Sequence, residues 1–357
     1  MDIQTKLLKI QQVGEEILTI DELKTLLETN SQPIAYDGFE PSGKLHIAQG
    51  TMRAINVNKM ISAGIKFKML VADIFGWMNN KMGGDLEAIR KVGEYQIEVW
   101  KACGMKTSKI EFVWANNNME DKEYWKKVIR IARENTVQRI TRCAQIMGRT
   151  EKDILSAAQI FYPCMQCADI FHLKADITQL GMDQRKVNIL AREVALKINC
   201  KKPVVVSHHM LMGLKEPRIK DNSVEAKIEM KMSKSQPESA IFMTDTEEEV
   251  EAKIKKAYCP EKKVEFNPLL EYYKFILFEK NKSIRFERAK KFGGDIEFDN
   301  YADLENAYVN GRLHPLDLKL TAAKAINKLL DPIRLHFKKN NKAKKLLDFV
   351  NSQSITR

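Results

Sequence analysis

The chain has 357 residues, more than one hydrophobic core usually supports, so two domains are expected. Hydrophobic residues make up 44% and charged residues 30%, a globular composition, and no apolar run reaches the length of about 18 residues that a membrane span needs. The formal net charge of +12 indicates a polyanionic partner such as nucleic acid. The N-terminus carries neither a secretory core nor a transit-peptide composition, which favours a cytoplasmic location.

The first two thirds of the chain alternate between helical and β-rich segments. Residues 1–32 carry helical patterns, with Thr19 as an N-cap before periodic leucines. The expected strands that follow are 33–37, 66–71, 110–114 and 203–207. The expected helices are 47–62, 86–103 and one long helical stretch over 120–147. This alternation predicts an α/β fold with a doubly wound parallel sheet.

Beyond about residue 245 the strand signals largely stop. Helical periodicity covers 246–257, 268–278, 302–309 and 316–337. In the last segment one face is apolar, made of Leu316, Leu320, Ala323, Ile326, Leu329 and Leu330. The sequence therefore predicts an α/β domain over 1–240 and an all-helical domain over 241–357. The basic run 338–345 is expected to be a tail, either solvated or in contact with RNA.

The chain has six cysteines: Cys103, Cys143, Cys164, Cys167, Cys200 and Cys259. A disulfide framework is not expected in a chain of this length without an export signal. Cys164 and Cys167 form a C-x-x-C pair, but no second pair lies at a usual metal spacing, and the nearest histidine, His172, is an unusual partner. We expect buried cysteines that pack a helix start, and no metal site.

Residues 36–50, Tyr-Asp-Gly-Phe-Glu-Pro-Ser-Gly-Lys-Leu-His-Ile-Ala-Gln-Gly, lead from an expected strand into an expected helix. Gly38, Pro41 and Gly43 predict a tight turn where the backbone approaches a ligand closely. The helix N-terminus that follows offers free N–H groups and a positive dipole end to phosphate. Such a turn indicates nucleotide binding only in combination with other features.

Residues 231–235, Lys-Met-Ser-Lys-Ser, place two lysines and two hydroxyls within five positions. This composition suits a mobile loop that clamps a triphosphate and stabilises the charge of departing pyrophosphate. The alternative interpretation is an exposed basic loop without a ligand.

Together, the two segments resemble the two signatures of class I aminoacyl-tRNA synthetases, in the chain order of that family. There the first signature reads H-I-G-H, whereas here it reads His46-Ile47-Ala48-Gln49. Gln49 thus replaces the final histidine, although its amide can still donate a hydrogen bond. The second signature, K-M-S-K-S, is intact. The resemblance implies a Rossmann-like catalytic domain.

The segment 161–169 indicates which amino acid would be the substrate. Tyr162, Gln166 and Asp169 are spaced i, i+4 and i+7 on one helix face, and their neighbours are apolar, so a pocket is expected rather than solvent. This helix resembles tyrosyl-tRNA synthetases of the eukaryotic and archaeal type. The resemblance extends over nearly the whole chain, including 143–148, 175–186, 207–211 and 314–317.

The resemblance implies roles in binding tyrosine. Tyr36 and Asp169 match residues that hydrogen-bond the phenolic hydroxyl, while Tyr162, Gln166 and Gln184 match those that hold the amino group and the body of the substrate. A buried carboxylate and phenol left unpaired would penalise phenylalanine, which lacks the hydroxyl. Tryptophanyl-tRNA synthetases share the fold and signatures but have no use for this pair, which favours tyrosine.

For ATP, the resemblance implies a site made of Gly38, Gly43, His46, Gln49, Gly181, Asp183, Met210, Leu211, Lys231, Met232, Ser233 and Lys234. Asp183 matches a ribose ligand, and the backbone of 210–211 would meet the adenine. His46, Gln49, Lys231 and Lys234 are the expected catalytic residues, the lysines stabilising pyrophosphate. Mg²⁺ is expected to arrive with ATP, held by substrate oxygens and water. His208 and His209 are expected to shape the turn beside the adenine.

The polyanion implied by the resemblance is tRNA(Tyr). Arg185 matches a position that reads the first acceptor base pair, and Phe292 lies in a glycine turn where an anticodon base could stack. In the segment His314–Asp317, Asp317 could accept a hydrogen bond from a base edge. Phe292 as core filler and Asp317 as a helix N-terminal charge stay open as alternatives. The resemblance also implies a homodimer paired through a helical insertion at 114–165.

The expected function is that of a tyrosine–tRNA ligase, in which tyrosine attacks ATP to form tyrosyl-adenylate and is then transferred to the 3′-terminal adenosine of tRNA. Three alternatives remain: a tryptophanyl-tRNA synthetase, a small nucleotidyltransferase, and an inactive paralogue that binds RNA. The nucleotidyltransferase would not need the C-terminal helical domain. The inactive paralogue would not need intact Lys231 and Lys234.

Overall fold

A six-stranded sheet forms the centre of the computed structural model, which describes residues 1–147, 154–221 and 223–353. Its strands are β1 (Gly14–Leu18), β2 (Ile34–Phe39), β3 (Lys66–Val71), β4 (Ile110–Trp114), β5 (Ile177–Thr178) and β6 (Val204–His208). Their order in the sheet is β1-β6-β5-β2-β3-β4, and all neighbours except β1 and β6 are parallel. The prediction of a doubly wound α/β fold is confirmed.

The sequence analysis did not predict two strands of this sheet. The helical patterns expected over 1–32 form helices at Ile3–Gln11 and Ile20–Thr29, but between them Gly14–Leu18 form an edge strand antiparallel to β6 that was not expected. This strand has a glycine and two glutamates, which are poor strand formers, so its pairing partner decides its conformation. β5 has only two residues, too few for a period-two pattern to appear.

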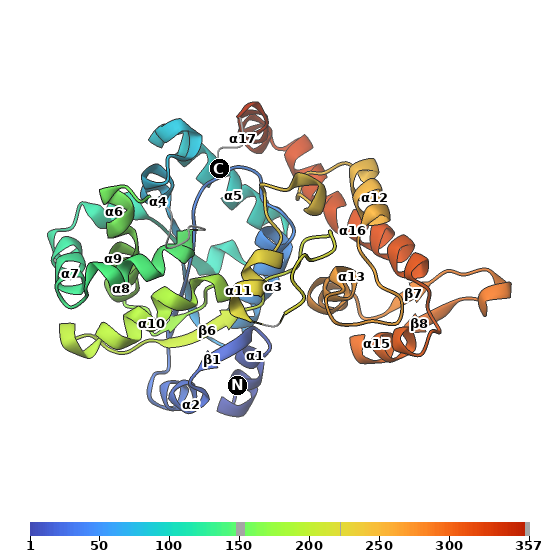
Figure 1. The fold of residues 1–357 in the computed structure, drawn as a ribbon, viewed down its shortest axis with the longest axis horizontal. Coiled ribbons are helices and arrows are strands. Elements are labelled where there is room, and N and C mark those ends of the chain that lie inside the picture. The colour runs from blue at the N-terminus through green and yellow to red at the C-terminus, as the bar shows by residue number, and fades with distance from the viewer. Residues whose placement is uncertain (148–153, 222, 354–357) are drawn as a thin grey trace.

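Helices cover both faces of the sheet (Figure 1). In chain order they are α1 (Ile3–Gln11), α2 (Ile20–Thr29), α3 (Arg53–Ser62), α4 (Asp73–Met78), α5 (Leu86–Ala102), α6 (Ala115–Met119), α7 (Lys122–Arg133), α8 (Val137–Thr141), α9 (Ala157–His172), α10 (Arg185–Val194) and α11 (Val224–Met230). A π-helical turn, Ala48–Met52, precedes α3. The expected single helix over 120–147 is instead broken into α7, α8 and a 3₁₀ turn, Arg142–Met147.

Alternate strand residues feed two separate cores, as the pleat requires. Ala35 and Phe67 belong to one core with α1, α2, α3 and α5, whereas Tyr36 and Leu70 belong to the other with α4, α7, α9 and α10. The second core contains Tyr36 and Tyr162 of the predicted tyrosine set, whereas Leu211 and Met232 of the predicted ATP set belong to the first. Residues 148–153 of the predicted insertion 114–165, and hence Gly148 of the segment 143–148, lie outside the described residues.

The C-terminal region is helical, as predicted, with one addition. Its helices are α12 (Glu247–Lys256), α13 (Pro268–Tyr272), α14 (Phe278–Lys280), α15 (Tyr301–Val309), α16 (Pro315–Lys339) and α17 (Asn341–Ser352). A short hairpin of β7 (Ile284–Phe286) and β8 (Ile296–Phe298) interrupts them and projects away from the sheet (Figure 1). The first core runs without a break from α1 to α17, so the boundary at 240 stays a prediction.

Two expectations for the end of the chain are wrong. Of the expected apolar face of α16, Ala323, Ile326 and Leu330 are buried, whereas Leu316 and Leu320 are 53% and 55% exposed, so that part of the expectation is wrong. Leu318 and Ala322 complete the buried face. The basic run is not a tail, because it continues into α17, which packs on α5 and α16 and has Ala343, Leu346 and Val350 buried. Among the described residues, no helix is both long and apolar enough to cross a membrane.

The cysteine pair lies in the middle of α9 rather than at its start. Cys164 and Cys167 are buried, and burial raises the pKa of Cys164 to about 12 and that of Cys167 well above its usual value. Both thiols are therefore protonated near neutral pH and pack as small apolar groups. Within the described ranges, no three His, Cys, Asp or Glu side chains are arranged to hold a metal ion.

Candidate active site

The candidate site lies where the strand order reverses. From β2 the chain proceeds through β3 to β4 on one side, whereas β5 and β6 are added on the other side. Ligands of open α/β sheets bind at the carboxyl ends of the strands at such a switch point. Gly38 lies near the carboxyl end of β2, and Gly181 follows β5, so this crevice brings together two segments that are far apart in sequence.

Tyr36 and Asp169 lie at the bottom of the crevice. Both are buried, at 1% and 0% exposure, and the charge of Asp169 contributes to a raised pKa of Tyr36, after the effect of burial. Asn118 Nδ2 donates to Asp169 Oδ1 at 3.1 Å, whereas Oδ2 has no hydrogen-bond partner among the described residues. Burial raises the pKa of Asp169 to about 8, and hydrogen bonds with Asn118 and Tyr124 act against this shift. A buried acceptor without a donor is costly, which indicates a missing ligand group.

The other residues of the predicted tyrosine set lie beside this pair. Tyr162 is buried and its ring meets Phe75 edge-on at 4.6 Å between centroids. Gln166 Nε2 donates to Gln184 Oε1 at 3.0 Å, and Gln184 Nε2 donates to the carbonyl of Ile146 at 3.1 Å. The pocket face of α9 predicted from the spacing is therefore buried, as expected.

The first signature forms the predicted tight turn. Gly43 has φ of +108°, a conformation that side-chain-bearing residues rarely adopt. Burial and the charges of Lys234 and Lys231 hold the pKa of His46 well below its usual value, so its ring is neutral, and its Nδ1 has no partner among the described residues. The Gln49 carbonyl accepts from Trp100 Nε1 at 2.9 Å, while its side-chain Oε1 is buried and unpaired within the described part of the chain.

The second signature closes over the first. Lys234 Nζ donates to Ser42 Oγ at 3.0 Å, and burial lowers the pKa of Lys234 to about 7. Lys231 Nζ lies 2.6 Å from Asp183 Oδ2. Ser233 Oγ is 2.9 Å from Ser235 Oγ, which keeps this hydroxyl within the loop. The two lysines thus face the first signature turn from the opposite wall.

Close packing at Gly181 positions the remaining predicted residues. A Cβ on Gly181 would lie 2.6 Å from Asp183 Oδ1 and 2.8 Å from Met210 Sδ, so a larger residue there would displace both side chains. Leu211 and Met232 are buried, and the Met232 N–H donates to the Leu211 carbonyl at 2.8 Å. The segments around 183, 210 and 232 therefore form one wall of the crevice.

A buried polar cluster under the crevice was missed. Arg53 Nη1 lies 2.6 Å from Asp37 Oδ2 and 2.9 Å from His208 Nδ1, and Gln179 Nε2 lies 3.1 Å from the same His208 nitrogen. Burial raises the pKa of Asp37 to about 7 and holds that of His208 well below its usual value. A carboxylate in an expected buried strand, Asp37, could have indicated a buried ion pair. Its partner Arg53 could not be predicted, because it lies on a different element, α3.

A second missed group supports the phosphate side of the crevice. Asn79 Nδ2 donates to Glu40 Oε2 at 2.6 Å, and Gln159 Nε2 donates to Asn79 Oδ1 at 3.2 Å. Burial raises the pKa of Glu40, although Lys81, 3.8 Å away, acts against this shift. Glu40 lies inside the first signature turn, and this position was the sequence feature that could have indicated its place in the site.

The four predicted tRNA contacts lie outside the crevice floor. Arg185 Nε binds both carboxylate oxygens of Glu16, at 2.9 and 3.0 Å. Phe292 is 64% exposed in the turn between β7 and β8, so it is not core filler. His314 and Asp317 form a capping box at the start of α16, with the His314 N–H donating to Asp317 Oδ2 at 3.0 Å.

Comparisons with known proteins agree with this geometry. The family model described as class I tRNA synthetases (W and Y) matches residues 28–331. Cytoplasmic tyrosine–tRNA ligase 1 of Arabidopsis thaliana is 53% identical over 351 residues, which are 98% of this chain and 88% of that protein.

Two solved structures extend the comparison. Tyrosyl-tRNA synthetase from Pyrococcus horikoshii, complexed with L-tyrosine, has a TM-score of 0.91 at 37% identity, with 98% of this chain and 100% of that chain covered. Leishmania major tyrosyl-tRNA synthetase in complex with tyrosinol has a TM-score of 0.89 at 44% identity. That match covers 99% of this chain but spans only 61% of the Leishmania chain. With its crevice, its two signatures and these relatives, this chain belongs to the tyrosine–tRNA ligases, within the class I tRNA synthetase family of tryptophan and tyrosine.

Proposed function

We propose that this chain activates L-tyrosine with ATP to form tyrosyl-adenylate and pyrophosphate, and then transfers tyrosine to the 3′-terminal adenosine of tRNA(Tyr) in the cytoplasm. The observation that carries the choice of tyrosine is the buried Asp169, whose Oδ2 has no partner among the described residues. A phenolic hydroxyl would satisfy this oxygen. The phenyl ring of phenylalanine has no donor and would leave it unpaired.

On the tyrosine side, Tyr36 and Asp169 bind the phenolic hydroxyl. Tyr162, Gln166 and Gln184 hold the amino group and the body of the substrate. The mutual hydrogen bond of the two glutamines supports this role, because it orients one amide against the other before the substrate arrives.

On the nucleotide side, Gly38, Gly43, His46 and Gln49 lie along the phosphates and ribose. This assignment is supported by two buried polar atoms of the first signature, His46 Nδ1 and Gln49 Oε1, which have no hydrogen-bond partner within the described ranges. Asp183 binds the ribose, and the backbone of Met210–Leu211 meets the adenine beside Gly181, where a larger side chain would collide.

Lys231 and Lys234, with Met232 and Ser233 between them, stabilise the departing pyrophosphate. Lys231 is paired with Asp183 here, so it exchanges a carboxylate for phosphate when ATP binds. Enzymes of this class use ATP as substrate, and we propose that Mg²⁺ arrives bound to the ATP phosphates and water.

The chemistry needs positioned charge rather than a protein base. The tyrosine carboxylate is already an anion, and it attacks the α-phosphorus in line while pyrophosphate leaves from the opposite side. Alignment of the two substrates and preformed positive charge around the leaving group lower the barrier. In the second step, a ribose hydroxyl of the terminal adenosine attacks the mixed anhydride and releases AMP.

For tRNA, we propose contacts at Arg185, Phe292, His314 and Asp317. The exposure of Phe292 supports stacking with an unpaired base. Arg185 would exchange Glu16 for the acceptor stem. Asp317 Oδ2 already accepts a hydrogen bond from the His314 N–H and lies 4.0 Å from Arg288 Nη1, so this oxygen is only partly available to a base edge.

We also propose that two copies pair through the insertion 114–165. Large apolar side chains are exposed on its packed helices α7, α8 and α9, which lie on the side of the sheet away from the C-terminal region (Figure 1): Ile129, Val137 and Phe161, at 54%, 67% and 43%. Exposed apolar side chains on neighbouring elements are one feature of protein interfaces.

A charge placed in this interface should separate the two copies. We expect Val137→Glu to halve the molar mass measured by light scattering after size-exclusion chromatography, because burying the carboxylate would cost more than the contact contributes. Leu320→Glu, at a leucine of α16 that is 55% exposed, is the matched control and should keep the dimer mass. A wild-type protein with monomer mass would contradict the proposed dimer.

The first test of the proposed function is amino-acid-dependent exchange of labelled pyrophosphate into ATP. We expect exchange with tyrosine and little with tryptophan or phenylalanine at the same concentrations. Exchange driven by tryptophan would keep the fold and contradict the substrate. A folded protein that exchanges with none of the three, yet binds tRNA, would support the inactive RNA-binding paralogue instead.

A further inference from the structure

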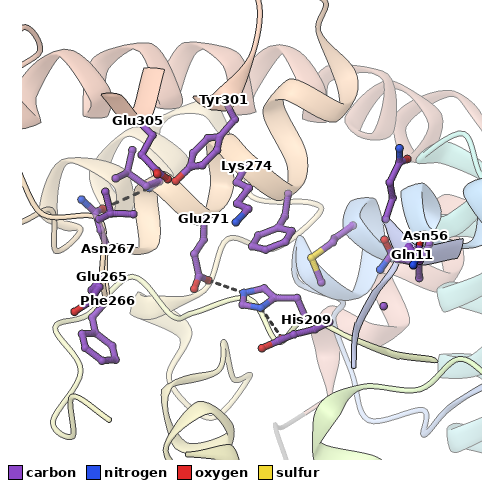
Figure 2. Close-up of a pocket in the computed structure, with 18 residues that line it drawn as sticks. Gln11, Asn56, His209, Glu265, Phe266, Asn267, Glu271, Lys274, Tyr301 and Glu305 are labelled. Atoms are coloured by element: carbon purple, nitrogen blue, oxygen red, sulfur yellow. Dashed lines mark hydrogen bonds and ion pairs between the residues drawn. The ribbon is translucent and has the colours of Figure 1, made fainter. Parts of the chain in front are cut away.

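A cavity of about 470 Å³ lies between the α/β part and α13, outside the candidate active site. Its walls carry polar and aromatic side chains, among them Glu15, His209, Glu271, Lys274, Phe275 and Tyr301 (Figure 2). At this point the two parts of the chain are therefore connected by a polar bridge across a hollow space. Packed apolar groups do not fill it.

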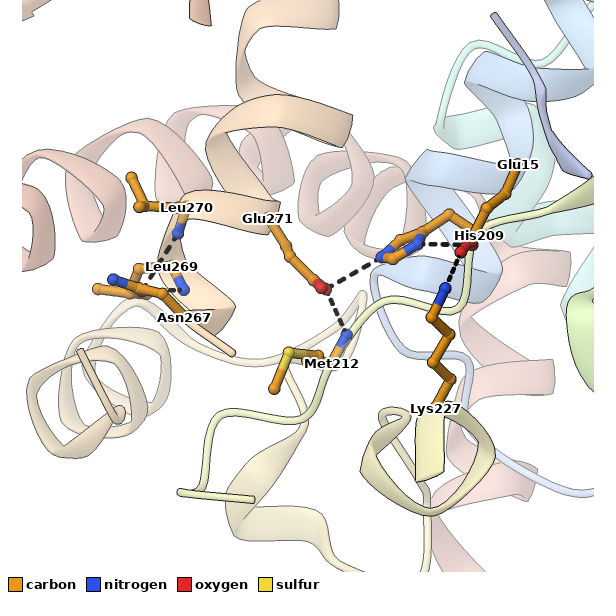
Figure 3. Close-up of polar contacts among 8 residues, drawn as sticks. All are labelled: Glu15, His209, Met212, Lys227, Asn267, Leu269, Leu270 and Glu271. Carbon is orange, nitrogen blue, oxygen red and sulfur yellow. Dashed lines mark hydrogen bonds and ion pairs between the residues drawn. The ribbon is translucent and has the colours of Figure 1, made fainter. Parts of the chain in front are cut away.

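Glu271 of α13 is the centre of this bridge (Figure 3). Its Oε2 accepts a hydrogen bond from the Met212 N–H at 2.8 Å and lies 3.1 Å from His209 Nε2. On the other side of the imidazole, Nδ1 lies 2.9 Å from Glu15 Oε2 of β1. Glu15 also binds Lys227 of α11. The Glu271 carboxylate of the C-terminal region thus contacts the segment after β6 at two residues, His209 and Met212.

The bridge is ionic at neutral pH. Burial alone would lower the pKa of His209, but the charges of Glu271 and Glu15 raise it to about 9. The contact with His209 lowers the pKa of Glu15 to about 2. The imidazolium also stacks on Phe275, with 4.1 Å between ring centroids. A charged ring held between two carboxylates and an aromatic face has few alternative orientations.

The segment that Glu271 holds is paired with the second signature. Met212 and Lys231 form an antiparallel bridge, the Gly213 N–H donates to the Met230 carbonyl at 3.0 Å, and the Met232 N–H donates to the Leu211 carbonyl at 2.8 Å. Backbone pairing therefore holds residues 211–213 against residues 230–232. Lys231 and Lys234, which face the first signature turn, continue from these paired segments.

We propose that Glu271 is a positioning residue that couples the C-terminal helical region to adenylate formation. By fixing the Met212 N–H and His209, it holds the segment that borders the adenine, and through the paired backbone it sets the place of Lys231 and Lys234. This inference rests on the proposed function for the two lysines. It assigns a role to a side chain that lies outside the crevice and touches no substrate.

The test compares Glu271→Ala and Glu271→Gln with Glu265→Gln, a carboxylate change in the same cavity. In pyrophosphate exchange, Glu271→Ala should raise the KM for ATP about tenfold and lower kcat, because small displacements of positioning groups are costly, and it should leave the KM for tyrosine unchanged. Glu271→Gln should lie between Glu271→Ala and wild type, since its amide oxygen still accepts from Met212. Glu265→Gln should match wild type.

Hydrogen exchange measured by mass spectrometry gives a readout that does not depend on activity. In Glu271→Ala, the amides of 211–213 and 230–235 should exchange faster than in wild type, with the tyrosine pocket helix α9 unchanged. Equal exchange in these segments, or KM values for ATP and tyrosine that rise together, would overturn the inference. Absence of exchange activity in wild type would contradict the proposed function, while the amide exchange would still decide the coupling.

Discussion

Replacing Asp169 with asparagine should impair tyrosine activation and at the same time stabilise the folded chain at alkaline pH. The substitution keeps the size of the side chain, and its amide oxygen can still accept from Asn118. It replaces the unpaired acceptor Oδ2, which the phenolic hydroxyl is proposed to bind, with an amide N–H group that cannot accept a hydrogen bond. Leaving a buried polar group unpaired costs about 1–3 kcal/mol, so kcat/KM for tyrosine should fall roughly five- to a hundredfold.

The stability effect follows from the direction of the pKa shift. Burial raises the folded-state pKa of Asp169 to about 8 from a usual value of 3.8, so the folded chain binds this proton more tightly than the unfolded chain. The associated stability is complete below about pH 4 and is lost as pH rises towards 8. Asparagine cannot ionise. The variant should therefore melt at a higher temperature than wild type at pH 8, with a smaller difference at pH 5.

The measurements are pyrophosphate exchange with tyrosine and phenylalanine, and thermal unfolding at the two pH values. Phenylalanine serves as the internal control, because it makes no contact through a hydroxyl and its activation should change less. The ratio of tyrosine to phenylalanine activation should fall in Asp169→Asn. An unchanged ratio would place the recognition of the hydroxyl elsewhere in the pocket.

Removal of the Lys234 ammonium should produce the largest loss of rate. Lys234 reaches Ser42 in the first signature turn, and its charge affects His46, so it lies where pyrophosphate departs in the proposed mechanism. Losing one preorganised group that stabilises transition-state charge costs roughly 10²–10³ in kcat. Lys234→Ala should show this loss in exchange, with an unchanged KM for tyrosine.

Lys231→Ala is the matched comparison within the same signature. Lys231 is bound to Asp183 before ATP arrives, so part of its interaction with phosphate is offset by the ion pair that it gives up. We therefore expect a smaller loss of kcat than for Lys234→Ala. Equal losses would show that both lysines contribute alike to the departing pyrophosphate.

The pH dependence gives an independent test of Lys234. Burial lowers its pKa to about 7, so the free protein loses this positive charge as pH rises through about 7. Because kcat/KM reports groups of the free enzyme, kcat/KM for ATP should decrease through the same range. Lys234→Arg should move this decrease to higher pH, since arginine stays protonated. A profile that is identical in the two proteins would exclude Lys234 as the titrating group.

Local sequence patterns determined much of the fold and most of the candidate crevice. The strand over 66–71 and the strand over 110–114 were predicted with the bounds that the structure has, and the helix over 86–102 to within one residue. The spacing of Tyr162, Gln166 and Asp169 predicted one buried helix face. These features follow from periodicities of 3.6 and 2 residues and from turn residues, which act over a few positions.

Tertiary structure alone decided the features whose partners are distant in the chain. β1 becomes a strand because β6 offers it an edge, although its own residues favour that state weakly. Asp37 and Arg53 meet below the crevice, and Glu271 reaches Met212, across 59 positions. No local pattern encodes such pairs, because burial and long-range packing bring them together. The sequence by itself thus determined the elements and the signatures, whereas packing decided which charged groups hold those signatures in place.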